Sequence, residues 1–444
     1  MRHTRTFEGY FTRAEARALT YHYIPFDVPA RCQRIAVSYA WRAPDGETPC
    51  TVDIGIFDIR GTEPFTGGFR GWSGSARRSF VIERDRATPG YIAGPLPSGA
   101  WNIILGLYEI PESGVHWSVS IEIDTSTFDG PSPSAPGTAM HASPIRPFAR
   151  PRWLRGDLHT HSEHSDGTNS IAEIARHAKL LGLDYLAITD HNTISHHAEI
   201  DARRWPVLLV PGEEVTTYTG HANVWGLREW ADFRFTTDDE IHRLLRWVDE
   251  RGRSISINHP KSVGPPWRFA DPGFAVREVW QAPWRWYNWE SVRDWDALLA
   301  EGRRITPVGG SDSHWVPPAE PMHPHTIATP TTWLLCESRS ESAILDAIRA
   351  GRTAISDAPD GPFVTLDRDA EGRLTATHRR AAGCTLVLVA DGEPRHRQEL
   401  ERPAGVIHLP GDLRFERYLR AELRTPAGNG REDVRALSAP VYAP

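Results

Sequence analysis

Apolar and polar residues alternate in short runs over the first 126 residues of the chain. The clearest runs with a period of two are Arg34–Trp41, Cys50–Phe57, Trp101–Tyr108 and Trp117–Ile123. Successive side chains of a β-strand point to opposite faces, so each run predicts a strand with one buried face. Gly, Pro and Asp residues separate the runs, as they do between antiparallel strands. The pattern therefore predicts an antiparallel, jelly-roll-like β-sandwich over residues 1–126.

Two other stretches flank the central part of the chain. Residues 127–150 contain five prolines among Ser, Gly and Ala, a composition typical of an extended linker. Residues 361–444 return to the alternating pattern, for example in Thr385–Ala390 and Val406–Pro410. We expect a small C-terminal β-domain there, packed on the central part.

Between residues 151 and 360, short apolar runs alternate with segments of helical periodicity. Ser170–Leu181 has apolar residues at helical spacing and ends before Gly182, a residue type favoured just after a helix. Thr237–Val248 opens with a Thr-x-x-Glu capping box. Strands that alternate with helices predict a parallel α/β barrel, and the active residues of such barrels lie where the strands end.

The apolar runs of the central part end in residues that can bind metal. His159 and His161 alternate, so a strand would point both imidazoles to one side, and Asp166 follows in a Ser-Asp-Gly turn. Further runs end at Asp190–His191, at Glu214 followed by His221, at His259, and at Asp312 with His314. Buried charged groups are costly unless they are paired or metal-bound, so these endings favour one metal cluster over unrelated polar loops.

These motifs, taken together, resemble the PHP family, the polymerase-and-histidinol-phosphatase metallohydrolases. The matching pieces are His159-x-His161 with Ser165-Asp166-Gly167, Thr189-Asp190-His191, Glu214, His221, Asn258-His259-Pro260 and Gly310-Ser311-Asp312-Ser313-His314. Within the family the chain looks most like the carbaryl-hydrolase-type branch, which has similar Gly-Glu-Glu-Val-Thr and Gly-Gly-Ser-Asp-Ser-His stretches. The resemblance covers residues 153–360 best. It implies that the barrel is a distorted, TIM-like (β/α)7 PHP barrel.

The resemblance also implies a trinuclear ligand set. One ion would be held by His159, His161, Glu214 and Asp312; a second by Glu214, His221 and His259; and a third by Asp166, His191 and His314. Two or three divalent ions are expected, and nitrogen and oxygen ligands without thiolate allow Mn, Zn or Fe. We expect Asp190 to orient a ligand histidine through its other ring nitrogen rather than to bind metal itself.

This ligand set predicts hydrolysis of a small phosphate ester by a metal-activated hydroxide at a di- or trinuclear site. Two alternatives use the same chemistry: hydrolysis of a carbamate or carboxylic ester, and an exonuclease acting on short oligonucleotides. Lys261, Arg268 and Arg285 follow the site-bearing runs and are candidate cationic partners for phosphate, although plain surface charge explains them equally well. Four tryptophans lie within residues 280–289. They form either an aromatic wall that receives a ring of the substrate or the packing between the barrel and the β-domain, and the sequence favours neither.

Charge and composition narrow the function further. The net charge of −7 argues against tight binding to long nucleic acid, which depends on many phosphate contacts. No apolar run is long enough to span a bilayer, and the first residues lack the apolar core of a signal peptide. The four scattered cysteines are typical of a reducing compartment. We expect a cytoplasmic enzyme with a small-molecule partner and no membrane contact; the sequence does not indicate its oligomeric state.

Overall fold

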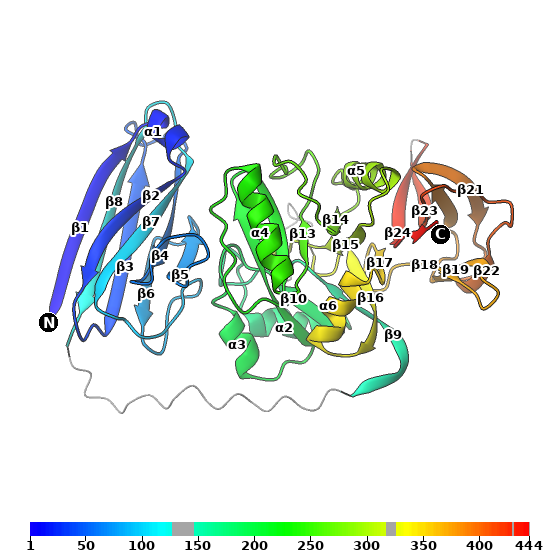
Figure 1. The fold of residues 1–444 in the computed structure, drawn as a ribbon, viewed down its shortest axis with the longest axis horizontal. Helices are drawn as coiled ribbons and strands as arrows, with labels where there is room; N and C mark the ends of the chain where they lie inside the picture. Colours follow the sequence, from blue (N-terminus) through cyan, green and yellow to red (C-terminus); the bar gives the residue numbers. More distant parts are fainter. Residues whose placement is uncertain (127–145, 317–325, 429, 444) are drawn as a thin grey trace.

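The computed structural model describes residues 1–126, 146–316, 326–428 and 430–443. It is a mixed α/β structure rich in strands, with an N-terminal β-part, a central part and C-terminal strands arranged in that order (Figure 1). Residues 127–145 of the expected linker lie outside the described residues, and the strand that follows begins at Pro147. No helix in the described ranges is long and apolar enough to cross a membrane.

The N-terminal part consists of two four-stranded antiparallel sheets. One sheet has the order β1 (Arg2–Phe11), β8 (Val115–Asp124), β3 (Arg34–Arg42) and β6 (Ser79–Glu83). The other has the order β2 (Tyr21–Val28), β7 (Gly99–Glu109), β4 (Thr51–Phe57) and β5 (Phe69–Gly74). Helix α1 (Arg13–Ala18) joins β1 to β2 and starts at a capping box. The inward residues of both sheets, such as Ile35 and Ile103, share one core, as the alternating pattern requires.

The central part carries nine strands and five helices in its described residues. The strands are β9 (Pro147–Asp157), β10 (Tyr185–Ile188), β11 (Leu208–Thr217), β12 (Gly220–Trp225), β13 (Ile255–Ile257), β14 (Val276–Gln281), β15 (Thr306–Gly310), β16 (Thr331–Ser338) and β17 (Thr353–Ser356). The helices are α2 (Ile171–Leu180), α3 (His197–Ala202), α4 (Asp238–Glu250), α5 (Asn288–Ala300) and α6 (Glu341–Arg349). Helix α4 starts at the capping box of Thr237, as the sequence predicts, and α2 also starts at a capping box, formed by Ser170 and Glu173.

Strand directions in the central sheet depart from a uniform parallel arrangement. The sheet order runs from β15 through β14, β13, β12, β11 and β10 to β9, then to β16 and β17. β12 is antiparallel to both of its neighbours, because β11 and β12 form a hairpin around Tyr218 and Thr219. The named strands form an open path in the described residues, so the expected (β/α)7 ring is not shown. A parallel bridge between Thr160 and Ser313 does join the segments that follow β9 and β15.

The C-terminal strands continue the central sheet rather than only packing on it. They are β18 (Phe363–Arg368), β19 (Leu374–Arg379), β20 (Thr385–Ala390), β21 (Glu393–Glu399), β22 (Ala404–His408), β23 (Tyr418–Gly428), β24 (Arg431–Ser438) and β25 (Val441–Tyr442). β24 pairs antiparallel with β17, and β23, β20 and β21 follow in order. β18, β19 and β22 form a separate three-stranded sheet.

The N-terminal sandwich and the central part share a hydrophobic core. Phe57, Phe69 and Trp72 of the sandwich pack with Trp230 and Phe233 of the central part. The rings of Phe69 and Trp230 stack with centroids 4.0 Å apart. Burial of aromatic surface on both sides fixes the two parts relative to each other.

We expect Phe69→Ala to lower the free energy of unfolding by about 3–5 kcal/mol, because the truncation leaves a cavity in this shared core. Urea unfolding followed by tryptophan fluorescence measures the change. Leu180→Ala removes a side chain that is 82% exposed and serves as the control, with a change below about 0.5 kcal/mol. A similarly small change for Phe69→Ala would contradict the shared core.

Candidate metal centre

Most of the candidate ligands lie at or just beyond the ends of strands in the central sheet. The segment after β9 carries His159 and His161, and His191 follows β10. Glu214 and His221 lie on the β11–β12 hairpin. His259 follows β13, and Asp312 and His314 follow β15. All nine ligands predicted from the sequence lie in three groups whose ligand atoms are within 4.8 Å of one another.

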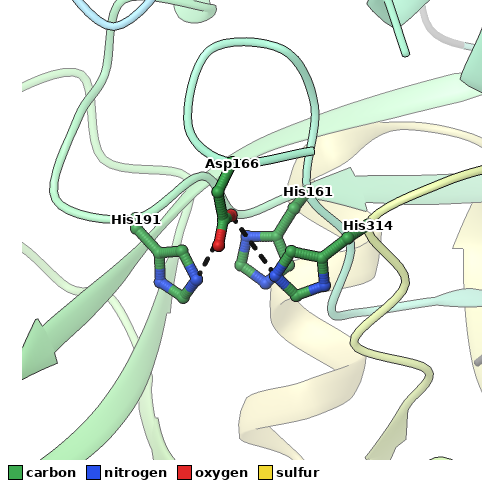
Figure 2. Close-up of side chains that lie close together, drawn as sticks. All are labelled: His161, Asp166, His191 and His314. Atoms are coloured by element: carbon green, nitrogen blue, oxygen red, sulfur yellow. Dashed lines mark ion pairs between the residues drawn. The ribbon is translucent and has the colours of Figure 1, made fainter. Parts of the chain in front are cut away.

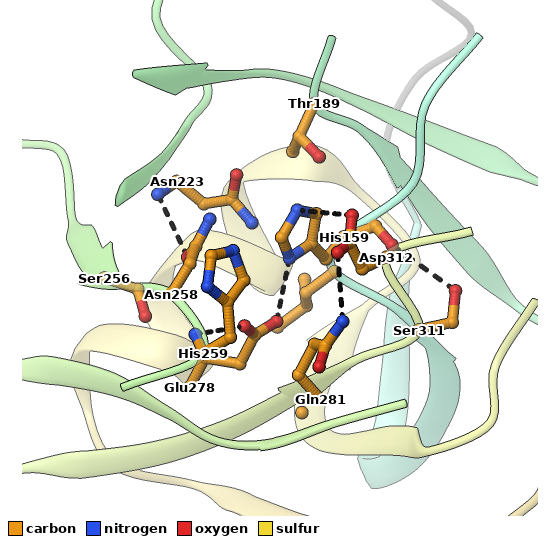
Figure 3. Close-up of polar contacts among 12 residues, drawn as sticks. His159, Thr189, Asn223, Ser256, Asn258, His259, Glu278, Gln281, Ser311 and Asp312 are labelled. Carbon is orange, nitrogen blue, oxygen red and sulfur yellow. Dashed lines mark hydrogen bonds and ion pairs between the residues drawn. The ribbon is translucent and has the colours of Figure 1, made fainter. Parts of the chain in front are cut away.

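The first group contains His159, His161 and Asp312. Asp312 Oδ1 lies 3.3 Å from His159 Nε2 and 3.0 Å from His161 Nε2. The fourth expected ligand of this ion, Glu214, is also near, with Oε1 3.3 Å from His159 Nε2. Figure 3 shows His159 and Asp312 turned toward each other.

The second group contains Glu214, His221 and His259. Glu214 Oε1 lies 3.3 Å from His221 Nδ1 and 3.5 Å from His259 Nε2. Since this same oxygen also faces His159, Glu214 lies between the first and second groups.

The third group contains Asp166, His191 and His314, together with His161 (Figure 2). Asp166 Oδ1 lies 3.3 Å from His314 Nε2 and 3.6 Å from His191 Nε2. His161 is therefore common to the first and third groups.

The residues fit divalent ions on their geometry and on their unsatisfied atoms. With metal–ligand bonds of about 2.1 Å, two ligands of one ion lie about 3–3.5 Å apart, which is the range of most nitrogen–oxygen distances above. His159 is fully buried, yet its Nε2 has no hydrogen-bond partner among the residues that the structure describes. A buried imidazole nitrogen of this kind is expected where a metal binds.

The carboxylates of the cluster are held in the ionised form that metals bind. Burial by itself raises the pKa of Glu214, but the surrounding histidines, His159 foremost, outweigh it and hold the pKa well below the usual value. Asp312 follows the same rule, with His159 as the main opposing charge. Both carboxylates are therefore available as ligands at neutral pH.

Backbone geometry at the cluster is strained. His259 has φ of 31° and Asp312 has φ of 54°, both in the left-handed region that residues other than glycine rarely adopt. Such conformations cost roughly 1–3 kcal/mol each and persist where the surrounding structure over-determines them. Gly310, two residues before Asp312, is required for a different reason: a Cβ there would lie 2.3 Å from the Cβ of His159.

Glu278 is a supporting residue that the sequence patterns did not reveal. It lies in the buried strand β14, where its Oε1 is 2.9 Å from His159 Nδ1 and its Oε2 accepts the backbone N–H of His259 at 2.8 Å (Figure 3). A carboxylate on this nitrogen fixes the tautomer that leaves Nε2 free for metal. The available signal was the charged pair Arg277 and Glu278 in the otherwise apolar run Val276-Arg-Glu-Val-Trp-Gln281, where burial requires a partner for each charge.

Two amides support the ligand carboxylates. Asn258 Nδ2 donates to Glu214 Oε1 at 2.7 Å, and Gln281 Nε2 donates to Asp312 Oδ2 at 2.9 Å. Each hydrogen bond fixes the orientation of one carboxylate. Gln281 leaves Oδ1 of Asp312 to face His159 and His161, whereas Asn258 donates to the same oxygen of Glu214 that faces His159, His221 and His259.

The expected role of Asp190 is corrected by its contacts. Its carboxylate accepts hydrogen bonds from Ser162 N, Ser162 Oγ and Ser165 Oγ, each at 2.7 Å, and lies 3.2 Å from His196 Nδ1. Within the described residues this carboxylate has no hydrogen bond to the side chain of a candidate ligand, although the Asp190 carbonyl accepts the backbone N–H of Glu214 at 3.2 Å. Asp190 therefore holds the loop between His161 and Asp166 instead of orienting a ligand histidine.

The three candidate phosphate-binding cations are placed differently. Arg268 is exposed, and its backbone N–H donates to Thr219 O at 2.8 Å. Lys261 is 5% exposed, and its Nζ donates to Gln281 O at 2.9 Å and to Asn288 Oδ1 at 3.2 Å. Burial lowers the pKa of Lys261 to about 8, against the attraction of Glu278 and Asp312. Arg285 instead lines an open groove of about 1450 Å³ between α5 and the C-terminal strands, and no candidate ligand lines that groove.

The tryptophan-rich segment is divided between packing and exposure. Trp280 is 1% exposed and packs in the core between β14, α5 and the C-terminal strands. Trp284 and Trp289 line the same groove as Arg285, and Trp289 is 42% exposed. Packing between domains therefore accounts for Trp280 but not for Trp289.

The sequence is similar to one known protein domain and to parts of two characterised proteins. Residues 157–228 match the PHP domain. The chain is 36% identical over 93 residues to an error-prone DNA polymerase of Nocardia farcinica, a stretch that covers 20% of this chain and 8% of the polymerase. It is 41% identical over 63 residues to a 5'-3' exoribonuclease of Haemophilus influenzae, covering 14% and 23%. The chain thus spans less than a quarter of the length of either relative.

Two solved structures are similar at low scores. One, from Bacteroides vulgatus, is described as a two-domain protein containing a predicted PHP-like metal-dependent phosphoesterase. It has a TM-score of 0.40 and 17% identity, covering 67% of this chain and all of that one. The other, a proposed metal-dependent phosphoesterase from Bifidobacterium adolescentis, has a TM-score of 0.28 and 17% identity, covering 38% and 89%. The PHP match and the clustered ligands together support a metal-dependent hydrolase.

We expect Glu278→Gln to weaken divalent-metal binding by about 10–100-fold, because the amide loses the charge that holds His159 in its binding tautomer. Competition of Mn²⁺ or Zn²⁺ between the protein and a fluorescent chelator measures the affinity. Glu393→Gln, an exposed change on β21, is the matched control and leaves the affinity unchanged. Equal affinities in the two variants would remove Glu278 from the site.

Proposed function

With residues 157–228 matching the PHP domain, we propose that the protein is a metal-dependent phosphoesterase that hydrolyses a small phosphate ester. The observation that carries the proposal is the convergence of nine ligands into three groups joined by Glu214 and His161. Joined groups of this kind can hold two or three ions on one substrate, an arrangement that stabilises the attacking and leaving oxygens of an in-line displacement at phosphorus.

We assign the ions to the three groups as the resemblance to the PHP family implies. One ion would be held by His159, His161, Glu214 and Asp312; a second by Glu214, His221 and His259; and a third by Asp166, His191 and His314. Divalent ions held there supply Lewis acidity toward a phosphoryl oxygen and toward water. The absence of thiolate in the donor set fits Mn, Fe or Zn.

The chain's own groups prepare the site around these ligands. Glu278 holds His159 and the His259 backbone, while Gln281 and Asn258 orient the carboxylates of Asp312 and Glu214. Lys261 adds a buried positive charge beside Gln281, which favours an anionic substrate near Asp312. These contacts reduce the reorganisation needed when charge develops in the reaction.

The PHP barrel that the sequence analysis led us to expect is part of the same proposal. We take β9 to β15 as a distorted seven-stranded PHP barrel with the ligands at one end. The bridge between Thr160 and Ser313 supports closure between the first and last strands of this set.

Two other substrates are kept because specific observations favour them. The match to an exoribonuclease favours phosphodiester bonds in short oligonucleotides, although the net charge of −7 disfavours long ones. The resemblance to the carbaryl-hydrolase-type branch favours a carbamate or carboxylic ester, which the same ligands could activate.

A panel of three aryl substrates tests the reaction class: a phosphomonoester, a phosphodiester and a carbamate, each with metal-loaded protein. We expect turnover of a phosphate ester and its loss by at least about 1000-fold in Asp312→Asn, since this change removes a charged ligand. Asp412→Asn alters an exposed carboxylate and retains the rate. Turnover of the carbamate alone would refute the phosphoesterase proposal.

Metal removal tests the dependence on ions directly. We expect dialysis against EDTA to abolish turnover, and Mn²⁺ or Zn²⁺ to restore it, while circular dichroism shows a folded chain throughout. Elemental analysis confirms that the ions have left. Full activity in protein shown to be free of metal would contradict the mechanism.

A further inference from the structure

We propose that the N-terminal β-sandwich positions the third ligand group, with Arg77 and Gly90 holding the loops that carry Asp166 and His191. This inference rests on the proposed metal-dependent function and extends it to residues outside the PHP match. The contacts that carry it come from three places: the loop after β9, the segment after β10 and the β11–β12 hairpin.

Asp166 is the ligand whose position depends most on its loop. Its side chain is 46% exposed, whereas that of Glu214 is 1% exposed. It lies in a turn nine residues after the end of β9 at Asp157, so no strand fixes it. Whatever holds the backbone of this turn therefore sets where the carboxylate stands relative to His191 and His314.

Arg77 holds the turn from the sandwich side. It lies half-buried in the loop between β5 and β6, and its guanidinium donates to the backbone carbonyl of Glu163. Glu163 is three residues before Asp166 in the chain. A charged donor on this carbonyl is a stronger restraint than a neutral hydrogen bond.

Gly90 contacts the segment that follows His191. Its N–H donates to Ser195 Oγ at 3.0 Å, and its carbonyl accepts from Thr193 Oγ1 at 2.9 Å. Gly90 has φ of +97°, and a Cβ there would lie 3.0 Å from the carbonyl oxygen of His164. Only glycine allows the sandwich backbone to approach both ligand loops this closely.

Ser195 connects the two loops to each other. Its Oγ is 2.8 Å from His164 Nδ1, so it joins the loop that carries Asp166 to the segment that carries His191. The same oxygen accepts the N–H of Gly90. Hydrogen bonds therefore connect the sandwich, the loop that carries Asp166 and the segment that carries His191.

The sandwich is rigid enough to act as a support. Tyr218, on the hairpin between Glu214 and His221, donates to Asp53 Oδ2 of the sandwich at 2.7 Å. Its ring also stacks against Tyr21, with centroids 5.9 Å apart. Together with the shared aromatic core, these contacts leave the sandwich little freedom to move away from the ligand loops.

The experiment compares Arg77→Ala and Ser195→Ala with Arg78→Ala. Arg78 is the neighbouring cation, but its guanidinium lies over the Trp41 ring inside the sandwich, 3.1 Å from the centroid. Each protein is stripped with a chelator and titrated with Mn²⁺. Calorimetry gives the affinity of each ion, elemental analysis the stoichiometry, and electron paramagnetic resonance the coupling between ions.

We expect Arg77→Ala and Ser195→Ala to bind the weakest ion at least about tenfold less tightly, as for other groups that orient ligands. Arg77→Lys restores part of the affinity, and Arg78→Ala binds as the unaltered protein does. If both test variants keep every ion at unchanged affinity, even with a lower melting temperature, the inference is overturned. If the unaltered protein binds no divalent ion, the proposed function fails instead.

Discussion

The buried carboxylate of Glu214 is the interaction on which the site depends. Its oxygens lie within 3.6 Å of ring nitrogens from five histidines: His159, His161, His191, His221 and His259. These histidines come from segments spread over a hundred residues of sequence. A fully buried anion is stable only with cations or donors around it, so strands β9 to β13 must bring their ends to this one point.

The ligands could be predicted from the sequence because they share a simple physical context. Most of them follow or end an apolar run, and apolar runs become buried strands whose ends gather in an α/β structure. Asp166, in its Ser-Asp-Gly turn, was assigned from the family motif instead. His159 and His161 also showed their common side through alternation. For the same reason the strands β3, β4, β7 and β8 lie close to the runs that predicted them.

Other features required contacts that no local pattern encodes. Glu278 supports His159 from the middle of a strand, and its role follows from the register between β13 and β14. Asp190 was assigned to the wrong partner because the loop after His161 folds back onto it. Arg285 follows a site-bearing strand in sequence, yet the start of α5 turns it toward the C-terminal strands. For Asp190 and Arg285 the tertiary path of a loop decided the outcome, and for Glu278 the pairing of two strands did.

The pairing of β17 with β24 has a consequence for how the chain can be divided. One hydrogen-bonded sheet runs from β15 to β21. The boundary near residue 360 that the sequence pattern predicts therefore does not separate two independent sheets. Cutting the chain there would expose the edge of β17, with its unpaired N–H and carbonyl groups, to other molecules. We therefore expect evolution to retain the central part and the C-terminal strands together in one chain. A recombination event that separated the two parts would produce an aggregation-prone fragment and not a smaller folded protein.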